Sequence, residues 1–178
     1  QLHSLYPETF SVEDNAQKPA EEYAALSQGD DLGWPYCYYD PQSKQKVLAP
    51  EYGGDGTTVG RCSDFTQPII GFPAHYAPND LLFYRGSRFP EAYQQGAFIA
   101  FHGSWNRAPL PQEGYQVVFA KNGEWDIFAD GFAGSESLKA SGQAEHRPMG
   151  LAETPQGDLL VVDSTEGKIW RIFAKPSP

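Results

Sequence analysis

The sequence predicts an all-β protein, and within that class part of a β-propeller with four-stranded antiparallel blades. Three observations favour this class. Short runs of β-forming residues alternate with turns, parts of the chain repeat one another, and Gly (18) and Pro (15) are abundant. Aromatic residues make up 14% of the 178 residues, enough for a packed apolar core. A β-sandwich or a simple meander remains the alternative.

The predicted strands of the second half of the chain are seven short runs. Each is rich in residues that favour strands and is bounded by Gly, Pro or Asn. They comprise residues 80–84, 96–102, 115–120, 124–128, 150–152, 158–163 and 168–173.

The first half of the chain has weaker patterns. Residues 1–32 are polar and acidic, and we expect an extended lead-in with a short helix over 19–26 that has Pro19 in its first turn. Residues 33–75 are rich in Gly, Pro, Tyr and Asp. They predict a loop-rich partial blade whose two short strands cover 36–39 and 46–49.

An internal repeat supports the propeller. GAFIAFH (96–102) matches GDLLVVD (157–163), and GYQVVF (114–119) matches GKIWRIF (167–173). The offsets are 61 and 53 residues, so the connecting loop of the second copy is eight residues shorter. In both copies a central strand ends on a polar residue, His102 in the first and Asp163 in the second.

The repeat divides the chain into blades. Residues 76–132 form one complete blade, and residues 148–175 form a last blade with only three strands. A closed ring needs at least about four blades. We therefore expect residues 1–178 to be a single C-terminal segment of a longer propeller. An N-terminal segment of the parent protein would supply the missing outer strand.

Charge and composition exclude several classes of function. The net charge of −10 repels phosphate backbones, so we expect no nucleic-acid partner. The longest apolar runs are too short to span a bilayer. The sequence contains no P-loop, GxGxxG, GxSxG, CxxCH or HExxH motif.

The two cysteines are Cys37 and Cys62, with 24 residues between them. In an oxidising compartment they would pair, which contributes roughly 3 kcal/mol through loop closure. In a reducing compartment they would remain free thiols. Spacing alone does not decide between the two.

The longer loop of the first repeat is the main candidate for function, because binding residues concentrate in loops on rigid scaffolds. It contains FHGSWNR (101–107). Trp105 offers a stacking face, Asn106 an amide and Arg107 a fixed cation, a set that suits a planar anionic ligand. The alternative is that Trp105 packs between blades and Arg107 forms a surface ion pair.

His75 and Arg147 each precede a predicted inner strand. Equivalent positions of propeller blades converge on the central axis, so we expect both side chains to reach one central region. The alternative for His75 is a structural role with its hydrogen bonds satisfied.

Four segments resemble the sorbosone/pyranose dehydrogenase family, a group of quinoprotein sugar dehydrogenases distantly related to soluble glucose dehydrogenase. They are GWPYCYYD (33–40), FPAHYAPNDLLFY (72–84), GAFIAFHGSWNR (96–107) and HRPMGLA (146–152). The resemblance covers essentially the whole chain and corresponds to the C-terminal half of the family. It implies a six-bladed propeller, a Cys37–Cys62 disulfide and a periplasmic or secreted location.

The resemblance also implies a reaction and its cofactors. Members oxidise a sugar or a sugar-derived alcohol or aldehyde with pyrroloquinoline quinone (PQQ) and calcium on the propeller axis. A general-base histidine takes the hydroxyl proton, and electrons leave to an acceptor such as a cytochrome. The base and the main calcium ligands belong to the N-terminal half. The catalytic residues of this chain are therefore unknown, no metal ligand is assigned, and we expect the segment alone to be inactive.

The resemblance also implies which residues of this chain contact the cofactor. Arg147 matches a cofactor-binding arginine, and His75 falls where the glucose enzymes have a cofactor-contacting threonine. Asn106 and Arg107 are the nearest equivalents of a cofactor lysine, while Met149 replaces a second arginine. With Trp105 as the stacking residue, the expected cofactor-binding set is His75, Trp105, Asn106, Arg107 and Arg147.

Two other functions remain possible on the residues alone. The first is a non-catalytic, propeller-derived module that binds a glycan or a protein partner. The second is a hydrolase acting on a lactone or glycoside, for which Asp163 is the one inward carboxylate that we can nominate.

Overall fold

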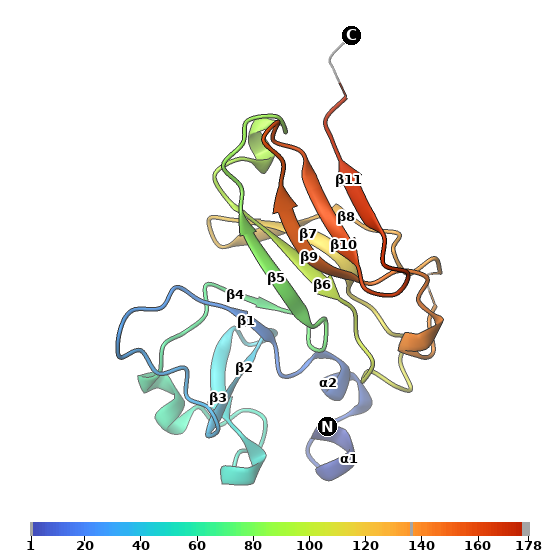
Figure 1. The fold of residues 1–178 in the computed structure, drawn as a ribbon. Coiled ribbons are helices and arrows are strands. Elements are labelled where there is room, and N and C mark those ends of the chain that lie inside the picture. Colours follow the sequence, from blue (N-terminus) through green and yellow to red (C-terminus); the bar gives the residue numbers. More distant parts are fainter. Residues whose placement is uncertain (1, 136, 176–178) are drawn as a thin grey trace. The chain divides into compact units, whose positions relative to one another are not determined.

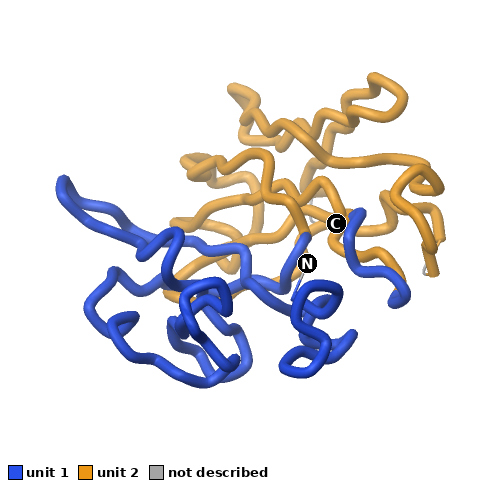
Figure 2. Tube along the Cα trace, turned by 90° about the horizontal axis from the view of Figure 1, so that it is seen from below, with its two compact units in different colours: residues 1–75, 105–110 blue, residues 76–104, 111–178 orange. Residues whose placement is uncertain are grey.

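The computed structural model describes residues 2–135 and 137–175. Its contacts divide the chain into two compact units, coloured separately in Figure 2. Unit 1 comprises residues 1–75 and 105–110, and unit 2 comprises residues 76–104 and 111–178. The FHGSWNR segment is therefore divided, because Ser104 belongs to unit 2 and Trp105 to unit 1.

Unit 2 contains a four-stranded and a three-stranded antiparallel sheet (Figure 1). The first has the order β5-β6-β7-β8 and the second the order β11-β10-β9. All seven predicted strands of this half are confirmed. They are β5 (Pro78–Phe83), β6 (Ala97–His102), β7 (Tyr115–Lys121), β8 (Glu124–Ala129), β9 (Pro148–Glu153), β10 (Leu159–Asp163) and β11 (Ile169–Ile172).

The sequence repeat corresponds to equivalent strand pairing in the two sheets. His102, the last residue of β6, pairs with Tyr115 of β7. At the matching place in the second sheet, the backbone N–H of Asp163 donates to the carbonyl of Lys168 at 2.8 Å. These features confirm the part of the prediction that concerns an all-β fold with antiparallel, blade-like sheets.

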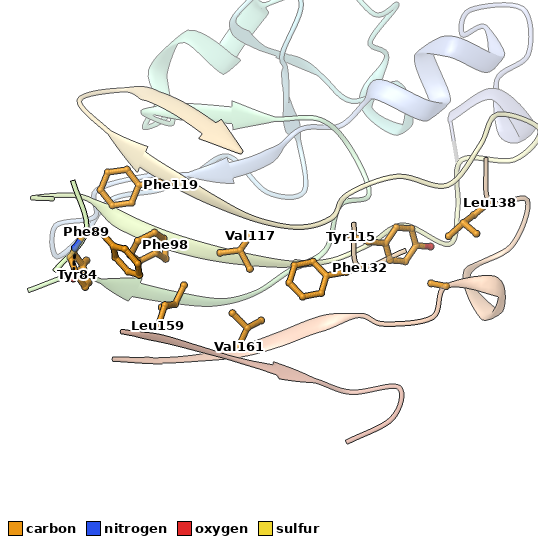
Figure 3. Close-up of a cluster of buried hydrophobic side chains, with 11 residues drawn as sticks. Tyr84, Phe89, Phe98, Tyr115, Val117, Phe119, Phe132, Leu138, Leu159 and Val161 are labelled. Atoms are coloured by element: carbon orange, nitrogen blue, oxygen red, sulfur yellow. Dashed lines mark hydrogen bonds between the residues drawn. The ribbon is translucent and has the colours of Figure 1, made fainter. Parts of the chain in front are cut away.

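Buried apolar side chains from both sheets form the core of unit 2. Phe98 of β6 and Val117 of β7 meet Leu159 and Val161 of β10 (Figure 3). All four are fully buried, and each such side chain contributes roughly 1.5–3 kcal/mol by leaving water. This core fixes β9 against β5 and β6, and with it the loops at the strand ends. Two short 3₁₀ turns, η3 (Glu91–Tyr93) and η4 (Ser141–Gln143), lie in the connections.

Unit 1 consists of two small antiparallel sheets and short helices. Strand β1 (Glu21–Tyr23) pairs with β4 (Ile70–Phe72), and β2 (Cys37–Asp40) pairs with β3 (Gln45–Leu48). Strands β2 and β3 match the predicted pair, whereas β1 and β4 had no clear signal in the sequence. The helical elements are α1 (Leu2–Leu5), α2 (Val12–Gln17), η1 (Pro50–Tyr52) and η2 (Gly60–Asp64).

The predicted helix over residues 19–26 is wrong. Residues 21–23 form strand β1, whose middle residue Glu22 pairs with the fully buried Lys46 ammonium at 2.6 Å. An isolated helix of this length is marginal in water, so strand pairing and a buried ion pair decide the outcome. The helix of this region is instead α2, where Ser11 and Asp14 form a reciprocal capping box (Ser11 Oγ accepts from Asp14 N, 3.0 Å).

The Cys37–Cys62 disulfide is confirmed, with a Cα–Cα distance of 5.8 Å. It joins the start of β2 to η2, and both residues are buried. The bridge therefore fixes the loop-rich part of unit 1 that has the least regular secondary structure.

Candidate functional site

Three of the predicted site residues of unit 1 meet at the end of helix α2. The ring of His75 donates from Nε2 to the carbonyl of Asn15 at 2.7 Å. The guanidinium of Arg107 donates from Nη1 to the carbonyl of Ala16. The side-chain amide of Asn15 donates to the carbonyl of Asn106 at 3.4 Å. The end of α2 thus organises residues that are distant in the sequence.

His75 has two unusual properties. Its φ of +67° lies in the left-handed region, which is uncommon for a residue other than glycine and is found at functional sites. Burial lowers the pKa of His75, although its hydrogen bond to Asn15 acts in the opposite direction. The ring is therefore neutral at pH 7, with its proton on Nε2 and an acceptor lone pair on Nδ1.

Trp105 and Asn106 line a cavity of about 190 Å³ in unit 1, together with His3, Ser4, Val12, Asn15 and Ala108. Trp105 is 69% exposed, so its indole face is open to a ligand. The side-chain oxygen Oδ1 of Asn15 is buried and accepts no hydrogen bond from the described residues. Such an atom is an acceptor position that a bound molecule can satisfy.

Arg107 behaves differently from its neighbours. It is only 2% exposed, so it is a buried side chain and not the surface cation that the sequence left open. Its hydrogen bond to Ala16 links the 105–110 loop to helix α2.

Arg147 lies in unit 2, directly before β9. Its Nε donates to the carbonyl of His102 at 3.0 Å and its Nη2 to the carbonyl of Gly103 at 2.9 Å. The guanidinium carbon lies 5.7 Å from the centre of the Tyr115 ring. Within the described chain these partners are neutral and no carboxylate forms an ion pair with Arg147. Its positive charge is therefore available to an anionic ligand.

Asp163 holds the backbone of Arg147 in place. Its carboxylate accepts hydrogen bonds from the backbone N–H groups of Arg147 and Thr165, both at 2.9 Å, and from Nδ1 of His146 at 2.8 Å. Burial alone would raise the pKa of Asp163, but these hydrogen bonds outweigh burial and lower it to about 2. Asp163 is thus a buried anion at physiological pH, already satisfied by the turn around it.

His102 lies beside this turn, with Nε2 2.8 Å from Oγ of Ser164. Burial lowers the pKa of His102, the nearby Arg147 lowers it further, and Asp163 partly opposes both. Because His102 is neutral, Arg147 is the permanent cation of the group formed by His102, Arg147 and Asp163.

The predicted site residues therefore fall into two groups. His75, Trp105, Asn106 and Arg107 belong to unit 1, and Arg147 belongs to unit 2. Asn15 was missed, because the capping box marks the helix around it but nothing marks Asn15 itself. Among residues 2–135 and 137–175, no three His, Cys, Asp or Glu side chains come together to hold a metal ion.

Comparison with known proteins gives consistent matches. The sequence model of the TrAA12-like family matches residues 6–175. An uncharacterized protein of Borreliella burgdorferi is 33% identical over 166 residues, covering 87% of this chain and 39% of the relative. A pyrroloquinoline quinone-dependent pyranose dehydrogenase of Coprinopsis cinerea is 28% identical over 174 residues, covering 82% and 23%. The chain thus spans less than half the length of these relatives.

Two solved structures share the fold. The calcium structure of the Trichoderma reesei member of Carbohydrate-Active Enzymes Family AA12 superimposes with a TM-score of 0.60 and 21% identity, covering 87% of this chain and 43% of the other. A glucose dehydrogenase superimposes with a TM-score of 0.54 and 18% identity, covering 89% and 39%.

Proposed function

Because the chain belongs to the TrAA12-like family, we propose that it is the C-terminal segment of a quinoprotein oxidoreductase that uses PQQ and calcium. The substrate of the whole protein would be a sugar or a sugar-derived alcohol or aldehyde. The observation that carries the proposal is the family match over residues 6–175, combined with an arginine whose charge no described carboxylate neutralises.

Each unit contains residues of the kind that a flat, carboxylated cofactor needs. Arg147 is half-buried and rigidly held, and it has N–H groups beyond the two that bind carbonyls. The exposed indole of Trp105 provides a face on which a planar ring can stack, and Asn106 lies beside it. We propose that Trp105 and Asn106 of unit 1 and Arg147 of unit 2 each contact the cofactor, and that Arg107 supports the 105–110 loop through its hydrogen bond to Ala16.

The roles of the chain in the reaction follow from these contacts. When bound, PQQ would supply a quinone as the hydride acceptor, and calcium would act as a Lewis acid. Arg147 neutralises and orients a carboxylate, and Asp163 keeps the backbone of Arg147 fixed. Trp105 excludes water from the face that it covers. We place the general base in the N-terminal half of the propeller, together with the main calcium ligands.

The proposed partners are the remaining half of the ring, a sugar and an electron acceptor such as a cytochrome. Strand β11 is an edge strand, and Ile169 on this strand and Phe173 directly after it are exposed at 66% and 53%. An outer strand from the N-terminal part of the parent protein would cover this edge. The disulfide favours a periplasmic or secreted location. No helix within the described ranges is long and apolar enough to cross a bilayer.

The proposal is tested by calorimetric titration of the chain with PQQ in the presence of calcium. We expect binding that Arg147→Gln weakens by about tenfold or more, the usual scale for loss of a charge-assisted contact. Arg85→Gln, an exposed arginine of the same unit, is the matched control and leaves the affinity unchanged. Absence of binding, or equal affinities for all three proteins, would refute the assignment.

A further inference from the structure

A second cavity of unit 1 is larger than the one beside Trp105. Its volume is about 320 Å³, and its lining includes Trp34, Tyr38, Tyr52, Lys18, Glu51 and His75. This volume lies in the range of small-ligand sites, which are mostly apolar with a few well-placed polar groups. The predicted cofactor residues Trp105, Asn106, Arg107 and Arg147 do not line it.

Exposed aromatic side chains form the rim of this cavity. Trp34 is 85% exposed, the highest exposure of any large apolar side chain among the described residues, and Tyr52 is 45% exposed. Single exposed apolar residues are common, but two aromatic rings beside one cavity form a flat apolar surface that a ligand ring can cover.

The Tyr52 side of the aromatic rim is held by several contacts. The ring of Tyr52 packs edge-on against the ring of Tyr36, with 4.7 Å between the ring centres. The guanidinium carbon of Arg61 lies over the Tyr36 ring, 4.3 Å from its centre. The backbone of Tyr36 is bonded to Gly33 and Ala49, both at 2.8 Å. The disulfide at Cys37 fixes the same loop. A surface held in this way loses little conformational entropy when it binds a ligand.

The interior of the cavity presents polar groups that suit hydroxyls. The phenol of Tyr38 is buried, burial raises its pKa, and it has no hydrogen-bond partner among the described residues. His75 also lines the cavity, and its Nδ1 is left as an acceptor because its Nε2 proton is used on Asn15. A phenol O–H and an imidazole lone pair can both be satisfied by hydroxyl groups, which donate and accept.

The charge of the cavity argues against an anionic ligand. The ammonium of Lys18 is 3.1 Å from a carboxylate oxygen of Asp14 and 3.1 Å from one of Asp40, so its charge is already compensated. Glu51 adds a negative charge to the lining. A tricarboxylate would be repelled here, whereas a neutral polyhydroxylated ring would not.

We propose that this cavity is a binding site for a neutral pyranose, with the sugar ring on Trp34 and Tyr52 and its hydroxyls bonded to Tyr38 and His75. The inference rests on the proposed function for the choice of pyranoses as the ligand class. It gives His75 a sugar-binding role in place of the cofactor contact that the family resemblance implies.

Amide and indole N–H correlation spectra of the ¹⁵N-labelled chain test the inference without cofactor. The chain has four tryptophans, so each indole signal can be assigned by substitution. On addition of glucose, and separately of cellobiose, we expect the Trp34 indole signal to move and the Trp105 signal to stay. Trp34→Ala removes a mostly exposed side chain, so the fold is retained, and it should weaken sugar binding by about tenfold or more. Leu26→Ala, which shortens a 63% exposed apolar side chain of the same unit that lines neither cavity, is the matched control and retains binding.

The outcomes separate this inference from the proposed function. If neither sugar moves the Trp34 signal at about 100 mM, far above millimolar affinity, the inference is wrong even where PQQ still binds. If the Trp105 signal moves instead, the sugar occupies the other cavity and the inference is also wrong. If sugar binds at Trp34 but PQQ does not bind the chain, the sugar site stands and the cofactor assignment fails.

Discussion

Replacing Asp163 with Asn tests whether one buried carboxylate organises the turn that carries Arg147. The substitution keeps the size of the side chain and removes its charge. Asp163 is 1% exposed and accepts hydrogen bonds from three backbone N–H groups and from His146. The asparagine variant keeps an oxygen acceptor on one side but presents an amide N–H₂ where the second oxygen accepted hydrogen bonds.

The magnitude follows from the pKa. A folded-state pKa of about 2, against the ordinary 3.8, corresponds to roughly 2 kcal/mol of stability. Because the folded-state pKa is the lower one, this contribution is fully present above about pH 4 and is lost as the pH falls towards 2. At pH 7 we therefore expect the variant to unfold with a free energy lower by about 2 kcal/mol.

Urea unfolding followed by circular dichroism at pH 7, 4 and 2.5 measures the effect. The difference between the wild-type protein and Asp163→Asn should be large at pH 7 and much smaller at pH 2.5. Asp126→Asn, an exposed carboxylate on β8, is the control and should change stability by less than about 0.5 kcal/mol. An Asp163→Asn variant as stable as the wild type at pH 7, or a difference that does not change with pH, would refute this reasoning.

Three further predictions concern the turn, the disulfide and the activity. Gly103 has φ +89°, and an added Cβ would lie 2.1 Å from the Tyr115 ring, so Gly103→Ala should cost more than about 2 kcal/mol in urea unfolding. Gly131→Ala, at a similar φ of +79° but with open space, should cost only about 1 kcal/mol. Replacing Cys37 and Cys62 together with Ala should lower the free energy of unfolding by about 3 kcal/mol through loop closure, and equal urea midpoints would contradict it. With PQQ and calcium added, the isolated chain should show no glucose- or sorbosone-dependent dye reduction in a spectrophotometric assay, whereas turnover would show that the segment is a sufficient catalyst.

Much of unit 2 could be predicted from the sequence because local and long-range signals agree there. Runs such as 96–102 combine strand-forming residues with flanking turns, and a second copy confirms their order. The matching positions of His102 and Asp163 placed both at strand ends, where the structure has them. Burial on both faces makes such runs nearly continuous in apolar residues and easy to recognise.

Unit 1 was predicted less well because non-local contacts decide its structure. Residues 21–23 pair with 70–72 across almost fifty positions, and no local pattern encodes that pairing. The cavities are also spatial properties. The loop that contains Trp105 has a clear signal in the sequence, but Asn15 joins it only through the end of α2. Trp34 lies in the GWPYCYYD segment, which indicates the family and no role for this tryptophan.

The two cavities of unit 1 have different chemistry, which bears on how the segment contributes to a whole enzyme. One presents an exposed indole and an unsatisfied amide oxygen, and the other presents two aromatic rings and compensated charge. Different ligands should therefore distinguish them. The pair of tryptophans, Trp105 and Trp34, serves as the reporter for each cavity.

The most direct test of the central claim is the indole N–H spectrum of the ¹⁵N-labelled chain during titration with PQQ and calcium. The account predicts that the Trp105 signal shifts and saturates while the Trp34 signal stays in place, and that Arg147→Gln raises the concentration needed for saturation. An unchanged Trp105 signal at about 1 mM PQQ, the weakest affinity expected of a specific site, would contradict it.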